Sequence, residues 1–252
     1  MPICCAYNGI FTKCKYQTVK NNAALLCKLK ILVELYLYYY DKRIILLLNY
    51  KKSEEFEMRK ILYVNACVKH DIASRTDRLA QAYLNKCLES QNCSLSVVNL
   101  EDTIMYPLTG KSLAERENAI ENNDFSGSQF ELAHSFAGAD EVVIAAPYWD
   151  MSFPALLKLY IEQLCVNKLT FCYDENGRPH GLTNIKKAVY LTTSGGYIGS
   201  NNFGFDYIKG VFSTLFSIPE ISFYSAEGLD IFGNDPEQIL AEAIEKMLDA
   251  QV

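Results

Sequence analysis

Residues 60–89, KILYVNACVKHDIASRTDRLAQAYLNKCLE, contain a strand, a loop and a helix in succession. The first part, residues 60–66, is a short apolar run without a helical stripe, which is typical of a buried strand. A loop follows, and from Ser74 to about Glu89 apolar residues recur at helical spacing. This order predicts the first strand–helix unit of a larger sheet.

The same alternation continues to the end of the chain. Further strands are expected at residues 94–99, 140–146, 186–193 and about 220–225, and helices at about 111–122, 127–138, 153–166, 204–217 and 235–250. Strands that alternate with helices indicate a parallel sheet covered by helices on both faces. Five strands favour an α/β fold of the flavodoxin-like type, a doubly wound five-stranded parallel sheet. Because such sheets bind ligands outside the carboxyl ends of their strands, the loops at 67–76, 147–153 and 193–204 form the candidate site.

Composition limits the classes of function. The chain has 252 residues, half of them apolar, which excludes a disordered or collagenous chain. The net charge of −6 disfavours binding to nucleic acid phosphates. Nine cysteines occur without a CxxC pair, so we expect no metal site and interpret them as reduced thiols of a cytoplasmic protein.

The first 57 residues differ from the rest of the chain. Residues 1–57 carry 9 Lys+Arg against 5 Asp+Glu, whereas residues 58–252 carry 15 against 25. The most hydrophobic stretch, residues 23–40, is interrupted by three charged side chains. Since a charge near a bilayer centre costs about 2.5–3.5 kcal/mol, we expect no membrane anchor.

Met58 is a candidate for the true start. The codons of Glu54 and Glu55 can be purine-rich like a bacterial ribosome-binding site, and they precede Met58 at a distance that suits such a site. We therefore expect residues 58–252 to be the functional domain and residues 1–57 to be an atypical extension outside it, produced by a mis-assigned start. In the alternative, residues 1–57 are native and tether the protein to a membrane.

The first candidate loop ends at a helix start. There the unpaired backbone N–H groups and the positive end of the helix dipole suit a phosphate. The hydroxyls of Ser74 and Thr76 add hydrogen bonds, and Arg75 adds charge. In the alternative, Ser74 or Thr76 only caps the helix. The GxxxxGK[ST] and GxGxxG patterns are absent from the sequence, so the usual loops for nucleoside triphosphates and dinucleotides are missing.

The other two loops suit a flat ring. The second contains Tyr148, Trp149, Asp150 and Met151, and the third contains Thr193, Ser194, Gly195 and Gly196. Aromatic and thioether side chains line conjugated rings well, although they also form hydrophobic lids. Two glycines allow a close approach of the backbone to a ligand, although they also serve in plain strand-to-helix turns.

The order of these motifs carries a resemblance to a family. An SxT loop at residues 74–76, an APxxxxxxP segment at 146–154 and the TSGG loop at 193–196 follow successive strands. The segments TFCYDENG at 170–177 and AEG at 226–228 complete the pattern. Together they resemble the FMN-dependent NADH-azoreductases and the related NAD(P)H:quinone oxidoreductases of flavodoxin-like fold, over essentially all of residues 58–252.

The resemblance implies a set of FMN-binding residues. Ser74, Arg75 and Thr76 would hold the phosphate, with Cys67 beside it. The isoalloxazine ring would be lined by Tyr148, Trp149, Asp150 and Met151, and its polar edge by Thr193, Ser194, Gly195 and Gly196. Tyr173 would reach toward the substrate.

Four of these positions depart from the residues common in the family. Cys67 replaces a serine, Arg75 a glutamine, Asp150 an asparagine and Ser194 an arginine. The phosphate site therefore loses a hydroxyl and gains a charge, whereas the ring site gains a carboxylate and loses a cation. Because Ser194 carries no charge, we expect weaker recognition of an anionic substrate or of a nicotinamide phosphate.

The resemblance also implies an activity. A hydride passes from NADH or NADPH through FMN to a small aromatic acceptor such as a quinone, azo compound or nitroaromatic, in a ping-pong reaction without a dedicated acid or base. A cytoplasmic homodimer with a shared active site is expected. Two alternatives stay open, a flavodoxin-type electron carrier and an FMN-binding regulatory protein without turnover.

Overall fold

The computed structural model describes residues 58–68, 74–89 and 92–250, and in the N-terminal segment Lys30, Tyr36 and Lys42. The chain divides at Met58 into two units. In the first unit the three described residues are helical and exposed. The hydrophobic stretch at 23–40 and the proposed origin of residues 1–57 otherwise lie outside the described residues. Within the described part of the chain, no helix is long and apolar enough to cross a membrane.

Five parallel strands form the main sheet in the order β2-β1-β3-β6-β7. Their bounds are β1 (Arg59–Asn65), β2 (Cys93–Asn99), β3 (Glu141–Ala145), β6 (Lys187–Thr193) and β7 (Glu220–Ala226). In this register Tyr63 at the middle of β1 lies between Val97 of β2 and Val143 of β3. The strand order reverses between β1 and β3, which is the switch point of a doubly wound sheet. The predicted fold class is thus confirmed.

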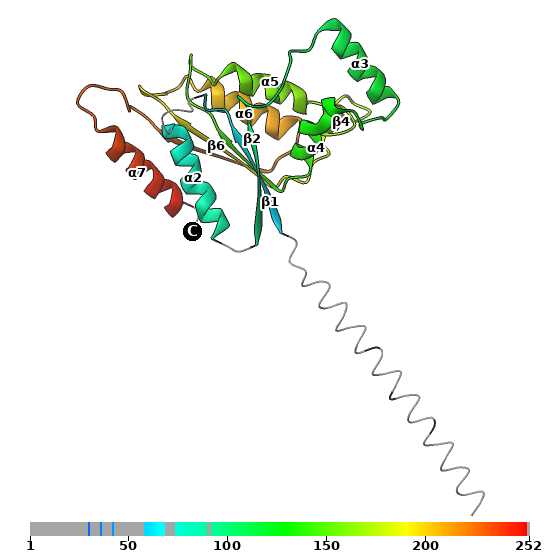
Figure 1. Cartoon of the computed structure of the whole chain (residues 1–252), viewed down its shortest axis with the longest axis horizontal. Coiled ribbons are helices and arrows are strands. Elements are labelled where there is room, and N and C mark those ends of the chain that lie inside the picture. Colours follow the sequence, from blue (N-terminus) through cyan, green and yellow to red (C-terminus); the bar gives the residue numbers. More distant parts are fainter. Residues whose placement is uncertain are drawn as a thin grey trace, which may run out of the picture. The chain divides into compact units, whose positions relative to one another are not determined.

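Helices cover both faces of this sheet (Figure 1). They are α2 (Arg75–Leu88), α3 (Gly110–Glu121), α4 (Glu131–Ala137), α5 (Ala155–Leu164), α6 (Phe203–Thr214) and α7 (Pro236–Asp249). Helices α2 and α7 pack on one face, and α4, α5 and α6 pack on the other. Helix α3 lies at the side of the domain away from α2 and α7 (Figure 1).

The middle of strand β1 is buried on both faces. Ile61 and Tyr63 belong to the core beneath α2 and α7, whereas Leu62 and Val64 belong to the core beneath α5 and α6. Successive side chains of a strand point to opposite faces, so an uninterrupted apolar run is what a doubly covered strand requires. This pattern explains why the apolar runs of the sequence predict the strands of the main sheet to within one or two residues.

A small hairpin was not predicted as strands. Strands β4 (Phe171–Tyr173) and β5 (Pro179–Gly181) pair antiparallel outside the main sheet. Each has only three residues, too few for an alternating pattern to be visible in the sequence.

The Asp174 side chain stabilises the turn of this hairpin. The Asp174 carboxylate accepts hydrogen bonds from the backbone N–H groups of Asn176 and Arg178, both at 2.8 Å. The bond from Arg178, together with the one from Asn176, lowers the pKa of the Asp174 carboxyl. Gly177 adopts a φ of 74°, which a glycine accommodates without strain.

Residues 127–138 do not form the single helix that was predicted. A 3-10 turn, Ser128–Phe130, precedes α4, and the backbone of Phe130 at φ −105° and ψ −1° separates the two. The buried Phe130 ring stacks edge-on against Phe125 at 5.4 Å between centroids. This packing holds the junction in a backbone conformation outside the regular helix.

Candidate functional site

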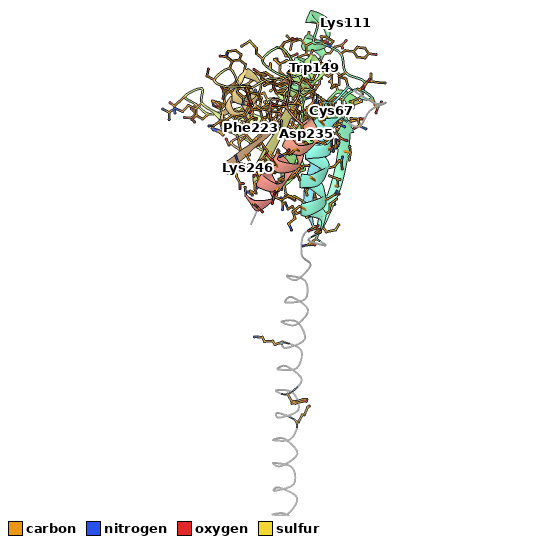
Figure 2. All side chains as sticks on the ribbon, turned by 90° about the vertical axis from the view of Figure 1, so that its left-hand side faces the viewer. Cys67, Lys111, Trp149, Phe223, Asp235 and Lys246 are labelled. Carbon is orange, nitrogen blue, oxygen red and sulfur yellow. The ribbon has the colours of Figure 1, made fainter. Side chains whose placement is uncertain are left out.

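The carboxyl ends of β1, β3 and β6 open on a pocket of about 370 Å³. Its lining consists of Cys67, Val68, Ser74, Arg75, Arg78, Pro147, Trp149, Thr193, Pro236 and Glu237. Residues from all three predicted loops thus meet in one place. Figure 2 shows Cys67 and Asp235 at the end of α2 and α7 where both helices begin, with Lys246 toward the other end of α7.

Helix α2 begins at the pocket. Ser74 is its N-cap, and the Ser74 hydroxyl accepts a long hydrogen bond of 3.5 Å from the Asp77 N–H. Within the described part of the chain, the N–H groups of Arg75 and Thr76 have no acceptor. Helix capping and anion binding are therefore compatible here, because two donors and the positive end of the dipole remain for a ligand.

Two groups beside this helix start, the half-buried Cys67 thiol and the buried Tyr63 hydroxyl, are neutral. Burial raises the pKa of the Cys67 thiol to about 11. Burial and the hydrogen bond to Asp77 also raise the pKa of Tyr63, whose hydroxyl donates to the Asp77 carboxylate at 2.5 Å. The bond to Tyr63 engages the only acidic side chain in the first turn of α2. At neutral pH the Cys67 thiol therefore adds no negative charge that would repel a phosphate.

A pair of hydroxyls joins the first loop to the third. The Oγ1 atoms of Thr76 and Thr193 lie 2.6 Å apart, and both residues are buried. One hydroxyl donates to the other, so the second proton is available to another acceptor. The contact links the first turn of α2 to the end of β6.

Two arginines of α2 line the pocket. The Arg75 guanidinium donates to the Leu229 carbonyl at 3.3 Å and to the Asp230 carboxylate at 2.8 Å. Arg78 makes a two-pronged ion pair with Glu237 at 2.8 and 2.6 Å. The predicted charge of Arg75 is present at the site, but part of its donor capacity is used within the protein.

The rim made by Arg78, Pro236 and Glu237 was not predicted. Pro236 and Glu237 begin α7, which packs beside α2 although Glu237 is 159 residues from Arg78 in the chain. Arg78 follows Arg75 by three positions, and this spacing places both on one face of α2. This spacing is the one feature of the sequence that could have indicated Arg78 as a residue of the pocket.

The second loop makes a tight turn. Trp149 and Ser152 exchange two backbone hydrogen bonds, at 3.1 and 2.7 Å, and the residues between them, Asp150 and Met151, have φ values of 50° and 65°. Two positive φ angles in a two-residue loop define a type I′ turn. Non-glycine residues pay about 1–2 kcal/mol for this conformation, so the turn is held by its surroundings.

Of the four predicted ring-lining residues in this loop, Trp149 lines the pocket. Tyr148 connects the second and third loops instead, because its N–H donates to the Thr193 carbonyl at 3.0 Å and its hydroxyl donates to the Asn201 carbonyl at 2.8 Å. Asp150 and Met151 are exposed beside the pocket rather than in its lining.

The third loop packs against the loop after β7. Three backbone N–H groups, of Gly228, Leu229 and Asp230, donate to the carbonyls of Gly196, Ser194 and Gly195 at 2.9 to 3.1 Å. A Cβ on Gly195 would overlap the Asp230 carboxylate, whereas one on Gly196 would meet open space. The Asp230 side chain would have to move to admit a Cβ at position 195, so the absence of a side chain on Gly195 serves the contact between these two loops.

Two further predicted residues do not reach the pocket within one chain. The Ser194 side chain is buried, and its hydroxyl donates to the Gly196 carbonyl at 2.6 Å. Tyr173 stands on β4, 55% exposed, with its ring edge-on to Phe171. Neither residue belongs to the lining.

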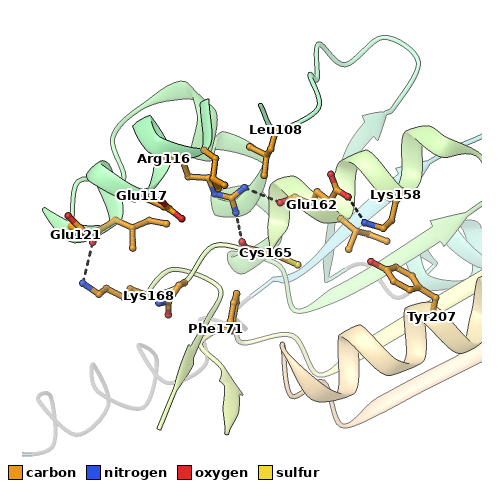
Figure 3. A pocket seen from close by; sticks show the side chains of 14 residues that line it. Leu108, Arg116, Glu117, Glu121, Lys158, Glu162, Cys165, Lys168, Phe171 and Tyr207 are labelled. Atoms are coloured by element: carbon orange, nitrogen blue, oxygen red, sulfur yellow. Dashed lines mark hydrogen bonds and ion pairs between the residues drawn. The ribbon is translucent and has the colours of Figure 1, made fainter. Parts of the chain in front are cut away.

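A second cavity, of about 610 Å³, lies between α3, α5 and α6 (Figure 3). Arg116 of α3 is buried there and donates to the carbonyls of Glu162 and Cys165, at the C-terminal end of α5. A cation at that end of a helix complements its dipole. None of the predicted site residues lines this cavity. Its one buried cation is explained by helix capping.

Comparison with known proteins defines the class first. A family model described as flavodoxin-like fold matches residues 59–250, and the chain belongs to this family. Azoreductase from Bacillus anthracis str. Sterne superposes with a TM-score of 0.68 at 22% identity, over 77% of this chain and 98% of that one. An FMN-dependent NADH-azoreductase of Bacillus anthracis str. Ames Ancestor, solved with FMN, gives 0.65 at 24% identity, over 77% and 97%. At these identities the likeness shows the fold.

Closer relatives define the enzyme. The FMN-dependent NADH:quinone oxidoreductase of Clostridium perfringens (strain ATCC 13124) is 32% identical over 199 residues, which are 76% of this chain and 97% of the relative. The FMN-dependent NADH:quinone oxidoreductase 2 of Clostridium acetobutylicum is 34% identical over 198 residues, 75% and 96%. The chain is an enzyme of this oxidoreductase family, which confirms the family and enzyme class expected from the motifs.

Proposed function

We propose that the protein binds FMN in the 370 Å³ pocket and transfers a hydride from NADH to quinones or azo compounds. The observation that carries the proposal is the helix start at the switch point of the sheet, where two N–H groups without an acceptor among the described residues meet two arginines. Such a donor set fits a phosphate. The names of the relatives, FMN-dependent NADH:quinone oxidoreductases, support this choice of cofactor and reaction.

The chain's own residues would bind and orient the cofactor. The N–H groups of Arg75 and Thr76, the Ser74 hydroxyl and the Arg75 guanidinium would hold the phosphate, with the neutral Cys67 thiol beside them. Trp149 would line the ring, and the tight turn through Asp150 and Met151 would keep its indole in place.

Bound FMN supplies the hydride chemistry, and the protein supplies orientation and electrostatics. Tyr148 and Thr193 would fix the two loops on either side of the ring, because the N–H of Tyr148 donates to the Thr193 carbonyl. Ser194, Gly195 and Gly196 would present the polar edge of the third loop. No side-chain acid or base is assigned to the reaction.

The proposal extends to a ping-pong order, to NADPH as a second donor and to nitroaromatic acceptors. It also includes a cytoplasmic homodimer with a shared active site. Tyr173 supports the shared site, because an aromatic ring 55% exposed on a short hairpin, outside its own chain's pocket, is available to a second subunit. Residues 58–252 would be the flavin-binding domain, with Met58 as the native start.

The test is an anaerobic absorbance titration of the full chain reconstituted with FMN. Flavin bands that bleach with NADH and return with a quinone would support the oxidoreductase, and parallel double-reciprocal plots would support the ping-pong order. A protein that takes up no FMN would refute the proposal. Flavin binding without NADH turnover would favour the electron carrier or the regulatory protein instead.

A further inference from the structure

Arg75 connects the start of α2 to the loop after β7. Its Nη1 donates to the Leu229 carbonyl at 3.3 Å, and its Nη2 donates to the Asp230 carboxylate at 2.8 Å. A guanidinium carries five N–H donors in one plane. These two contacts therefore fix the plane of the Arg75 guanidinium and leave donors for the pocket that this residue lines.

Asp230 is itself held in place from the third loop. Its N–H donates to the Gly195 carbonyl at 2.9 Å, and its carboxylate lies where a Cβ on Gly195 would be. The Asp230 side chain is 65% exposed and does not line the pocket. The carboxylate therefore contacts Arg75 without occupying the space that a ligand would use.

The second arginine is arranged differently. Arg78 uses both terminal nitrogens on the two carboxylate oxygens of Glu237, and Glu237 belongs to the pocket lining. That pair is close to neutral toward an incoming anion. Arg75, whose counter-ion Asp230 lies outside the pocket lining, is the better placed of the two cations to bind a phosphate.

We propose that Asp230 is a positioning residue for the phosphate of the flavin, acting through the Arg75 guanidinium. The inference rests on the proposed function, since it assumes that FMN binds in this pocket. Without the Asp230 carboxylate the long Arg75 side chain keeps only the 3.3 Å contact with the Leu229 carbonyl. It then samples more rotamers, and ordering it on the phosphate opposes binding. With Asp230 present, the Arg75 side chain is already ordered before FMN binds.

The test compares two ligands that differ only by the phosphate. The full chain, freed of flavin, is titrated with FMN and with riboflavin while quenching of flavin fluorescence is followed. Arg75→Gln is expected to raise the Kd for FMN about tenfold or more. Asp230→Asn is expected to raise it about 3- to 10-fold. Neither change should alter the Kd for riboflavin, and the double variant should be no weaker than Arg75→Gln alone.

Two further variants complete the design. Asp230→Glu restores the carboxylate and should recover part of the FMN affinity that Asp230→Asn loses. Glu89→Gln removes an equal charge that pairs with Lys86 at the far end of α2, and it should leave both affinities unchanged. Circular dichroism checks that each variant is folded.

The outcomes separate the two proposals. If Asp230→Asn binds FMN as well as the wild type or more tightly, this inference is wrong while the proposed function stands. An equal loss of FMN and riboflavin affinity would show that Asp230 only supports the packing of the third loop, and it also overturns the inference. A wild-type chain that binds neither flavin overturns both.

Discussion

The Thr76–Thr193 hydroxyl pair makes a sharp prediction about stability. The two residues come from the first and third loops, are 1% and 9% exposed, and share a hydrogen bond of 2.6 Å. Replacing Thr76 by Val keeps the shape and removes one hydroxyl. The Thr193 hydroxyl then remains buried without its partner, which costs about 1–3 kcal/mol. Thr76→Val should therefore lower the free energy of unfolding by about that amount.

The double variant distinguishes this mechanism from a simple loss of packing. Thr193→Val should cost about 1–3 kcal/mol for the same reason. When both hydroxyls are replaced, no buried group is left unsatisfied, so Thr76→Val/Thr193→Val should cost no more than either single change. The coupling energy of this cycle should therefore be about 1–3 kcal/mol, in the direction that restores stability.

Urea denaturation of the four proteins, followed by circular dichroism, measures these energies. Thr183→Val serves as the matched control, because the Thr183 hydroxyl is buried without a partner among the described residues. This variant should be neutral or slightly stabilising. Additive costs in the Thr76/Thr193 cycle, or a Thr183→Val variant as unstable as Thr76→Val, would refute the reasoning.

Three further predictions concern single positions. Gly181→Ala should unfold at a clearly lower temperature in thermal denaturation, because its Cβ would overlap the Phe216 backbone. Gly210→Ala lies in a helix interior with open space around it, so its free energy of unfolding should rise by about 0.5–1 kcal/mol. Alkylation of Cys67 by iodoacetamide, followed by mass spectrometry, should be slow at pH 7, and its rate should rise up to about pH 11. The stability that this thiol contributes is present below its unfolded pKa of 9.0 and is lost as the pH rises from 9.0 to about 11. An alkylation rate that levels off near pH 9 would contradict the raised pKa. Met151→Asn should raise the free energy of unfolding, measured by urea denaturation, by up to about 1 kcal/mol, because asparagine tolerates a φ of 65° better than methionine. A lower free energy of unfolding would show that the Met151 side chain packs more than its exposure indicates.

The sequence predicts the main sheet well for a physical reason. Strands β1, β3 and β6 are covered on both faces, so most of their side chains are buried and the strands appear as mainly apolar runs without alternation. The loops that leave their carboxyl ends are then assigned to one edge of the sheet. That step needs only the parallel topology, which is why the amino-acid sequence alone is enough to group Cys67, Ser74, Arg75, Trp149 and Thr193.

Features that depend on the packing of distant segments could not be predicted in this way. Glu237 lies at the pocket because α7 packs along α2, and no local pattern near residue 237 indicates that contact. The close neighbour of Gly195 could not be predicted for the same reason, because it is the Asp230 carboxylate in the loop after β7. The positive φ of Met151 likewise arises in a segment without glycine, so its turn has no sequence signal.

The pocket is a set of loops that hold one another rather than three independent elements. Thr76 bonds to Thr193, Tyr148 bonds to Thr193 from the other side, and Arg75 bonds to the loop that carries Asp230. A site whose parts are fixed before the ligand arrives loses less entropy on binding. The same connections mean that a substitution in one loop alters the others. Changes at Thr193 should therefore affect the phosphate end and the ring end of a bound flavin together.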